Sequence, residues 1–136
     1  MKLLMLIPLL TLAIIAAAAA TRADQTTTGP AKDARTLYHV VNLKFKADTS
    51  KEQIEAVEDA FSGLKGKIEG IRSLDWGTNV SPEGLDKGFT HCFVLTYTSE
   101  QARDVYLKHP EHQRFIELLK PILADALVID FWSKGK

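Results

Sequence analysis

Hydrophobic and polar residues alternate along several stretches of the chain, and a period of two predicts β-strands. The clearest stretches are residues 37–45 and 90–97, and shorter ones lie at 73–79, around Trp76, and at 126–132. The faces that would turn toward a core are His39, Val41, Leu43 and Phe45 in the first strand, and His91, Phe93, Leu95 and Tyr97 in the third. Four strands are therefore expected.

The segment after the first strand has the period of an amphipathic α-helix. Ser50 precedes it, and Gln53 three places on completes a capping-box pattern. The apolar stripe recurs at spacings of three and four and consists of Ile54, Val57, Phe61 and Leu64. This pattern predicts one helix between the first two strands.

A second helical segment follows the third strand and is interrupted by a proline. Thr98 and Gln101 form a similar capping pattern at its start. His109 precedes Pro110, which biases it away from helical geometry, whereas Pro110 suits the first turn of a new helix. This new helix is expected to end around Pro121.

The predicted order is β-α-β-β-α-β, the ferredoxin-like arrangement of an α+β fold with an antiparallel sheet. Its helices cover only one face of the sheet. The other face still carries Tyr38, Val40, Cys92 and Val94. Leaving this surface in water costs about 25 cal/mol per Å², so we expect a second sheet to cover it, in a homodimer.

The N-terminal residues form a separate kind of segment. Lys2 is followed by an almost wholly apolar run that ends in five alanines at 16–20. This pattern predicts a signal peptide over residues 1–20, cleaved after Ala20 or Ala23, then a flexible linker over 21–35. The alternative is an uncleaved membrane anchor; Pro8 and the lack of a stop-transfer charge cluster favour cleavage. We therefore expect an exported protein (periplasmic or extracellular) with no stable membrane insertion after cleavage.

The charge balance argues against a nucleic-acid partner. Lys and Arg number 17, as do Asp and Glu, and the formal net charge is zero. The basic residues are scattered singly, without interleaved aromatic residues. The one cysteine, Cys92, cannot form an internal disulfide, and we expect it to face the dimer side of the sheet, opposite His91.

Several motifs follow one another in an order seen in a known family. They are His-Val-Val-Asn-Leu-Lys-Phe-Lys at 39–46, Trp-Gly at 76–77, Gly-Phe-Thr-His at 88–91, Tyr-Leu-Lys-His-Pro-Glu-His at 106–112 and Leu-Val-Ile-Asp-Phe at 127–131. With these motifs, residues 36–133 resemble the stress-responsive A/B-barrel (Dabb) family. The resemblance implies a ferredoxin-like monomer whose dimer forms an α/β barrel, which agrees with the argument from the sheet faces.

The resemblance also implies site residues. A plant polyketide cyclase of this family works without metal or cofactor, and its pocket residues fall on His39, His91, Tyr106 and His112. In that enzyme the last histidine is the base and the tyrosine positions the substrate. An exported protein would not meet cytosolic coenzyme-A thioesters, so the cyclase's substrate is not expected to carry over.

The residues themselves point to similar chemistry. All four histidines could approach one cavity, and His transfers protons near neutral pH while a Tyr hydroxyl can polarise a carbonyl oxygen. The predicted catalytic residues are His112 and Tyr106, and the predicted ligand-pocket residues are His39, His91, Trp76 and His109. Alternatively, these histidines are core or cap residues with satisfied hydrogen bonds.

Metal and carboxylate chemistry receive less support from the sequence. No HExxH, CxxC or clustered carboxylate pattern accompanies the histidines, so neither a metal nor a cofactor is expected. Asp75 and Asp130 show no paired arrangement. Two function classes remain: a module that binds a small apolar carbonyl compound, and a cofactor-independent cyclase or lyase with His112 as its base.

Overall fold

A computed structural model describes residues 35–134 of the chain. The predicted signal peptide, and the predicted linker up to residue 34, lie outside the described residues. The elements are β1 (Leu37–Phe45), α1 (Lys51–Ser62), α2 (Leu64–Lys67), β2 (Ser73–Thr78), β3 (His91–Tyr97), α3 (Glu100–Lys108), α4 (Pro110–Leu119) and β4 (Leu123–Trp132). The predicted order of strands and helical segments is confirmed.

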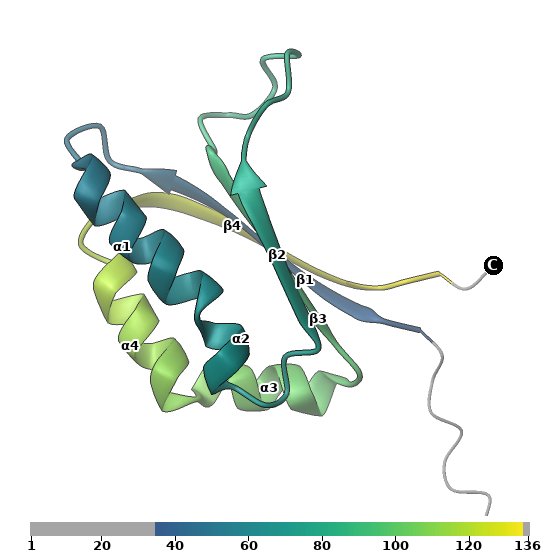
Figure 1. Ribbon diagram of the computed structural model, residues 1–136. Helices are drawn as coiled ribbons and strands as arrows, with labels where there is room; N and C mark the ends of the chain where they lie inside the picture. The colour runs from purple at the N-terminus through teal and green to yellow at the C-terminus, as the bar shows by residue number, and fades with distance from the viewer. Residues whose placement is uncertain (1–34, 135–136) are drawn as a thin grey trace, which may run out of the picture. The chain divides into compact units, whose positions relative to one another are not determined.

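The four strands form one antiparallel sheet in the order β2-β3-β1-β4. Figure 1 shows the helices gathered on one face of this sheet. Because sequential strands β2 and β3 are neighbours while β1 and β4 meet only after the helices, the topology is the ferredoxin-like one. The α+β prediction is therefore correct, and no helix of residues 35–134 lies over the opposite face of the sheet.

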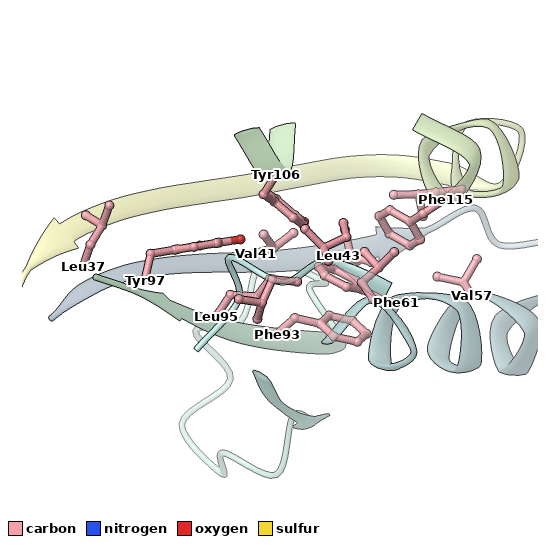
Figure 2. Packing of buried hydrophobic residues seen from close by; sticks show 14 of the residues in the cluster. Leu37, Val41, Leu43, Val57, Phe61, Phe93, Leu95, Tyr97, Tyr106 and Phe115 are labelled. Atoms are coloured by element: carbon pink, nitrogen blue, oxygen red, sulfur yellow. The ribbon is translucent and has the colours of Figure 1, made fainter. Parts of the chain in front are cut away.

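The core lies between the sheet and the helices (Figure 2). In the register of β1 and β3, Val41 lies opposite Phe93, and both side chains are buried. The ring of Phe61 on α1 stacks on Phe93 with centroids 3.9 Å apart, and Phe115 on α4 packs on Phe61 at 4.5 Å. These aromatic contacts join both helical segments to the middle of the sheet.

The first predicted helix cap is confirmed. Ser50 accepts a hydrogen bond from the backbone N–H of Gln53, whose side chain accepts from the N–H of Ser50. The second predicted capping box is wrong: Ser99, not Thr98, is the N-cap of α3, and its hydroxyl accepts from the N–H of Ala102 at 3.2 Å. Two adjacent hydroxyl residues can both cap, and the tertiary path of the turn selects the second.

The last strand begins three residues earlier than expected. Leu123 already pairs with Phe45 of β1, and a register shift follows between Lys44 and Phe45. The alternation of side chains predicted a start at residue 126. Pairing with β1, which side-chain alternation does not reveal, sets the true start of the strand.

The uncovered face of the sheet carries a band of apolar side chains on β1 and β4. Leu127, Ile129 and Phe131 are about half exposed. Tyr38 stacks on Phe131 with ring centroids 4.9 Å apart. An exposed apolar band of this kind is typical of a protein–protein interface.

Candidate functional site

A group of polar rings lies inside the core where α3 and α4 meet the sheet. Tyr106 on α3 and His112 on α4 have ring centroids 4.3 Å apart, and His39 on β1 lies 5.6 Å from Tyr106. Tyr97, at the end of β3, lies 5.7 Å from Tyr106 and 6.4 Å from His39. We call these four residues the His/Tyr cluster. It unites three of the predicted site residues with Tyr97.

His112 is held in one tautomer. Its Nδ1 lies 3.1 Å from the carbonyl oxygen of Leu107. Because a carbonyl only accepts, Nδ1 carries the proton, and Nε2 of the neutral ring has a free lone pair. Burial lowers the pKa of His112 below its ordinary 6.5, the hydrogen bond to the Leu107 carbonyl partly opposes this, and electrostatic repulsion from His39 lowers the pKa further. His112 is thus a neutral ring with an available basic nitrogen near pH 7.

Tyr106 supplies a hydroxyl that stays protonated. Only 1 % of this residue is exposed, and the ring packs against the rings of His39, Tyr97 and His112. Burial, and to a smaller extent the negative charge of Asp130, raises the pKa of Tyr106 well above its ordinary value of 10. Its hydroxyl is therefore a neutral hydrogen-bond donor across the physiological pH range.

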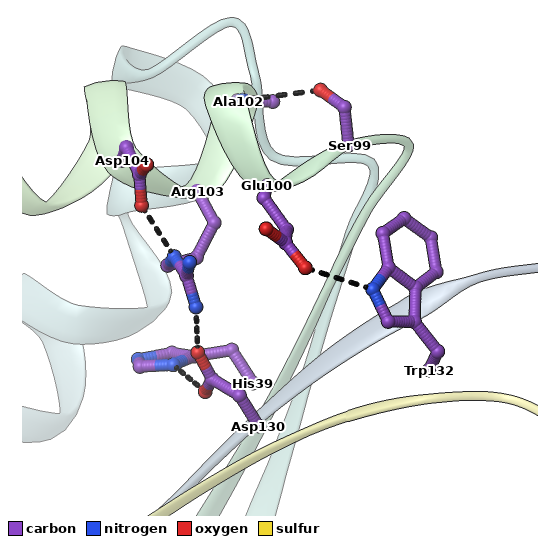
Figure 3. A network of polar contacts seen from close by, with 8 residues as sticks. All are labelled: His39, Ser99, Glu100, Ala102, Arg103, Asp104, Asp130 and Trp132. Atoms are coloured by element: carbon purple, nitrogen blue, oxygen red, sulfur yellow. Dashed lines mark hydrogen bonds and ion pairs between the residues drawn. The ribbon is translucent and has the colours of Figure 1, made fainter.

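His39 is fixed by a network that reaches the edge of the helical layer (Figure 3). Its Nδ1 donates to Oδ1 of Asp130 at 2.6 Å, and Oδ2 of Asp130 accepts from Nη1 of Arg103. Arg103 also donates from Nε to Asp104 at 2.8 Å. A carboxylate that accepts from His39 fixes the orientation and tautomer of the ring, so that its Nε2 points away from Asp130.

The remaining two histidines lie elsewhere, so the four do not share one cavity. His91 pairs with Leu43 of β1, whereas His39 pairs with Leu95 of β3. The two rings are four residues apart along the sheet, about 13 Å at the usual rise of a strand. Side-chain alternation predicted correctly that His39 and His91 lie on one face of the sheet, but it does not predict the distance between them.

His91 belongs to a second group of residues. Its Nε2 donates to Oε1 of Glu58 on α1 at 2.9 Å, and its Nδ1 lies 2.8 Å from the hydroxyl of Thr90. Its ring packs edge-on against Phe45 at 5.1 Å and lies parallel to Trp76 at 6.4 Å. Both ring nitrogens are therefore engaged, unlike those of His112. Trp76 and His91 line a cleft of about 550 Å³ beside the loop at 79–90.

His109 occupies the break between α3 and α4. Its backbone is extended, with φ −67° and ψ 138°, as the following proline requires. Its Nδ1 accepts from the N–H of Glu111 at 3.2 Å, which makes it the N-cap of α4. The side chain of His109 makes the hydrogen bond of a helix cap, while its backbone N–H donates to the carbonyl oxygen of Tyr106 at 3.0 Å.

Three residues of this region were not singled out from the sequence. The sequence shows no partner for Asp130, and no motif in it marks Arg103 or Tyr97 as a site residue. The sequence does indicate that Tyr97 faces the core, because alternation places it on the same face as Leu95. The sequence gives a weaker indication for Asp130, which is an acidic residue inside an apolar strand. Its pairing with His39 depends on the contact between β1 and β4.

Cys92 lies on the other face of β3, opposite Asn42 in the neighbouring strand, and burial raises the pKa of its thiol. Its predicted orientation away from His91 is confirmed.

Within residues 35–134, no three His, Cys, Asp or Glu side chains are grouped so that they could hold a metal ion. In the same part of the chain, no helix is long and apolar enough to cross a membrane.

Comparison with known sequences matches almost all of the described chain. The family model described as "Stress responsive A/B Barrel Domain" matches residues 37–133. The stress-response A/B barrel domain-containing protein HS1 of Arabidopsis thaliana is 37 % identical over 93 residues, covering 68 % of this chain and 85 % of HS1. Olivetolic acid cyclase of Cannabis sativa is 26 % identical over 93 residues, covering 68 % of this chain and 92 % of the cyclase.

Solved structures show the same fold. The crystal structure of At3g17210 from Arabidopsis thaliana matches with a TM-score of 0.69 and 34 % identity, over 74 % of this chain and 97 % of that one. A protein of Jannaschia sp., described as dimeric and ferredoxin-like, matches with a TM-score of 0.63 and 27 % identity, over 71 % and 97 %. The dimeric state of such neighbours supports a homodimer here.

Proposed function

The chain belongs to the stress responsive A/B barrel domain family, and from this premise we propose that it binds a small, partly apolar carbonyl compound at the His/Tyr cluster. Ligand sites are mostly apolar with a few convergent polar groups. The cluster has this composition, since its polar atoms lie among core residues such as Val41 and Phe115.

The observation that carries this proposal is the pairing of His112 with Tyr106. A purely structural core would be served by apolar rings at both positions, because buried polar groups cost free energy unless they are hydrogen-bonded. Here Nδ1 of His112 is bonded to Leu107, which leaves Nε2 beside the phenol ring. A ligand carbonyl can accept from the Tyr106 hydroxyl while its apolar part contacts the surrounding rings.

Entry of a ligand requires movement. Tyr106 and His112 are 1 % and 9 % exposed, so a ligand reaches them only when side chains at the junction of α3 and α4 move aside. Pro110 interrupts the helical hydrogen bonds at this junction, and His109 is extended there. The junction is therefore where we expect the opening.

A protein-observed NMR titration with 1-phenylpentan-1-one tests the binding. We expect saturable shifts at the backbone amides of α3, α4 and β1, and a loss of at least tenfold in affinity in His112→Gln. Tyr38→Phe is the control, since Tyr38 stacks on Phe131 on the uncovered face of the sheet, away from the His/Tyr cluster, and we expect it to bind like the wild type. Shifts confined to the cleft beside Trp76 would contradict the proposal.

A second candidate function is abstraction of a proton next to the carbonyl group, and the tautomer of His112 favours it. Nε2 would take a proton from the carbon beside the carbonyl, the electrons of the C–H bond would form a C=C bond, and the π electrons of the carbonyl group would move onto its oxygen to give an enolate. The Tyr106 hydroxyl would donate to that oxygen. Olivetolic acid cyclase, at 26 % identity, is a relative named for a cyclisation.

Deuterium uptake tests this second candidate. In D₂O, 1-phenylpentan-1-one should gain deuterium at the carbon beside its carbonyl faster with the wild-type protein than in buffer, as measured by mass spectrometry. Both His112→Gln and Tyr106→Phe should reduce this rate, the former to the buffer level. If the ketone binds but exchanges no faster than in buffer, the proposed binding stands and the proposed proton abstraction is wrong.

We also propose that the protein acts outside the cytoplasm. The support is the apolar run after Lys2, with its five terminal alanines, which fits a cleaved signal peptide. An exported binding protein would meet small apolar compounds from its surroundings.

A further inference from the structure

Tyr97 holds a buried hydroxyl that has no partner among residues 35–134. The residue is 0 % exposed, and its Oη makes no hydrogen bond within this part of the chain. Among the buried side chains of residues 35–134, only Thr49 has an oxygen in the same condition. Buried polar atoms are nearly always hydrogen-bonded, and an unpaired one is destabilising. A phenylalanine would fill the same space without this cost, so the packing of the core does not explain the tyrosine.

The unpaired hydroxyl lies inside the His/Tyr cluster. Figure 2 shows the Tyr97 ring running from β3 into the core, with its oxygen toward Val41 and Tyr106. The ring packs against Tyr106 and His39, at 5.7 Å and 6.4 Å. The pKa of Tyr97 is raised far above its ordinary value by burial first, then by the nearby Tyr106 and Asp130. The hydroxyl therefore stays protonated near neutral pH and is available to donate a hydrogen bond.

We propose that the hydroxyl of Tyr97 donates a hydrogen bond to the oxygen of the bound ligand, beside the Tyr106 hydroxyl, and so selects compounds with a carbonyl oxygen over apolar compounds of the same shape. This inference rests on the proposed binding at the His/Tyr cluster and adds a specificity-determining residue to it. Two neutral phenols that converge on one oxygen suit a ketone or its enolate, because each donates and neither brings a charge into the core.

The selectivity has a physical basis in the unpaired state of the donor. A site built to hydrogen-bond a ligand rejects an analogue that lacks the acceptor, because the buried donor is then left unsatisfied. Removing the hydroxyl should therefore weaken binding of the ketone and leave binding of the matched hydrocarbon unchanged. No other change in shape accompanies Tyr→Phe.

The test compares two ligands and three proteins. The ligands are 1-phenylpentan-1-one and pentylbenzene, which differ only in the carbonyl group, and the proteins are the wild type, Tyr97→Phe and Tyr38→Phe. Tyr38 lies on the opposite face of the sheet, stacked on Phe131, so it is a matched control for the loss of one phenol. Affinities are measured by NMR titration, and the unfolding temperature of each protein is recorded.

We expect Tyr97→Phe to bind the ketone five- to tenfold more weakly, to bind pentylbenzene as before, and to unfold at the same or a higher temperature. Tyr38→Phe should keep the wild-type preference for the ketone. Equal affinity of Tyr97→Phe and the wild type for the ketone would overturn the role of Tyr97 while leaving the proposed function intact. A lower unfolding temperature for Tyr97→Phe would show that the hydroxyl has an internal partner, and would also overturn it. If the wild type binds neither ligand, the proposed function falls and the inference with it.

Discussion

The imidazole of His112 and the phenol of Tyr106 lie with ring centroids 4.3 Å apart, across the break that Pro110 makes between α3 and α4. If one helix continued through this point, Tyr106 and His112 would lie on the same helix, six residues apart. The break lets the two rings approach the sheet from separate helices. It thereby places a basic nitrogen and a protonated hydroxyl side by side in the core.

Acidification is expected to destabilise the protein through His112. Its pKa is lowered in the folded state, so the unfolded chain binds the proton more readily. The contribution of the neutral ring is fully present above the ordinary pKa of 6.5 and is lost as the pH falls through the lowered value. Urea unfolding of the wild type and His112→Gln between pH 7.5 and 5 should show a difference in unfolding free energy that shrinks toward acid. A difference independent of pH would contradict this prediction.

Asp130→Asn should destabilise the fold. Asp130 joins His39 and Arg103, and its side chain is 26 % exposed, so its hydrogen bonds are partly shielded from water. We expect a loss of about 1–3 kcal/mol in unfolding free energy at pH 7, measured with urea. Asp104→Asn is the control, because that exposed carboxylate contacts the same arginine, and its effect should stay within about 0.5 kcal/mol. Equal losses in the two variants would refute a special role for Asp130.

The uncovered face of the sheet is expected to form the dimer interface. Ile129 lies opposite Val40 on this face and is about half exposed. Ile129→Asp would place a charge in an apolar contact and should convert the dimer to a monomer in native mass spectrometry at micromolar concentration. Val105→Asp, on the exposed side of α3, is the matched control and should remain dimeric. If Ile129→Asp remains dimeric, the interface lies on another surface.

The proposed signal cleavage predicts a defined N-terminus for the mature chain. Protein recovered from outside the cytoplasm of its own host should begin at Thr21 or Asp24, as intact-mass measurement would show. Retention of residues 1–20 in a membrane fraction would instead favour the anchor alternative.

The sequence alone determined the elements and the face that each presents. Alternation in 37–45 and 90–97 placed His39, His91 and Tyr97 on the helix side of the sheet, because adjacent side chains of a strand point to opposite faces. The pair His109–Pro110 predicted the break between α3 and α4 through the local backbone geometry that proline imposes. These features depend on neighbours in the chain, so local chemistry is enough to find them.

Only the tertiary structure decided which of these residues meet. The register of β1 against β3 set His39 about 13 Å from His91, and the pairing of β1 with β4 brought Asp130 to His39. The unpaired hydroxyl of Tyr97 also appears only in the packed core. Register and helix docking are set by contacts between residues distant in sequence, and side-chain periodicity gives the direction of a residue without its position along the sheet.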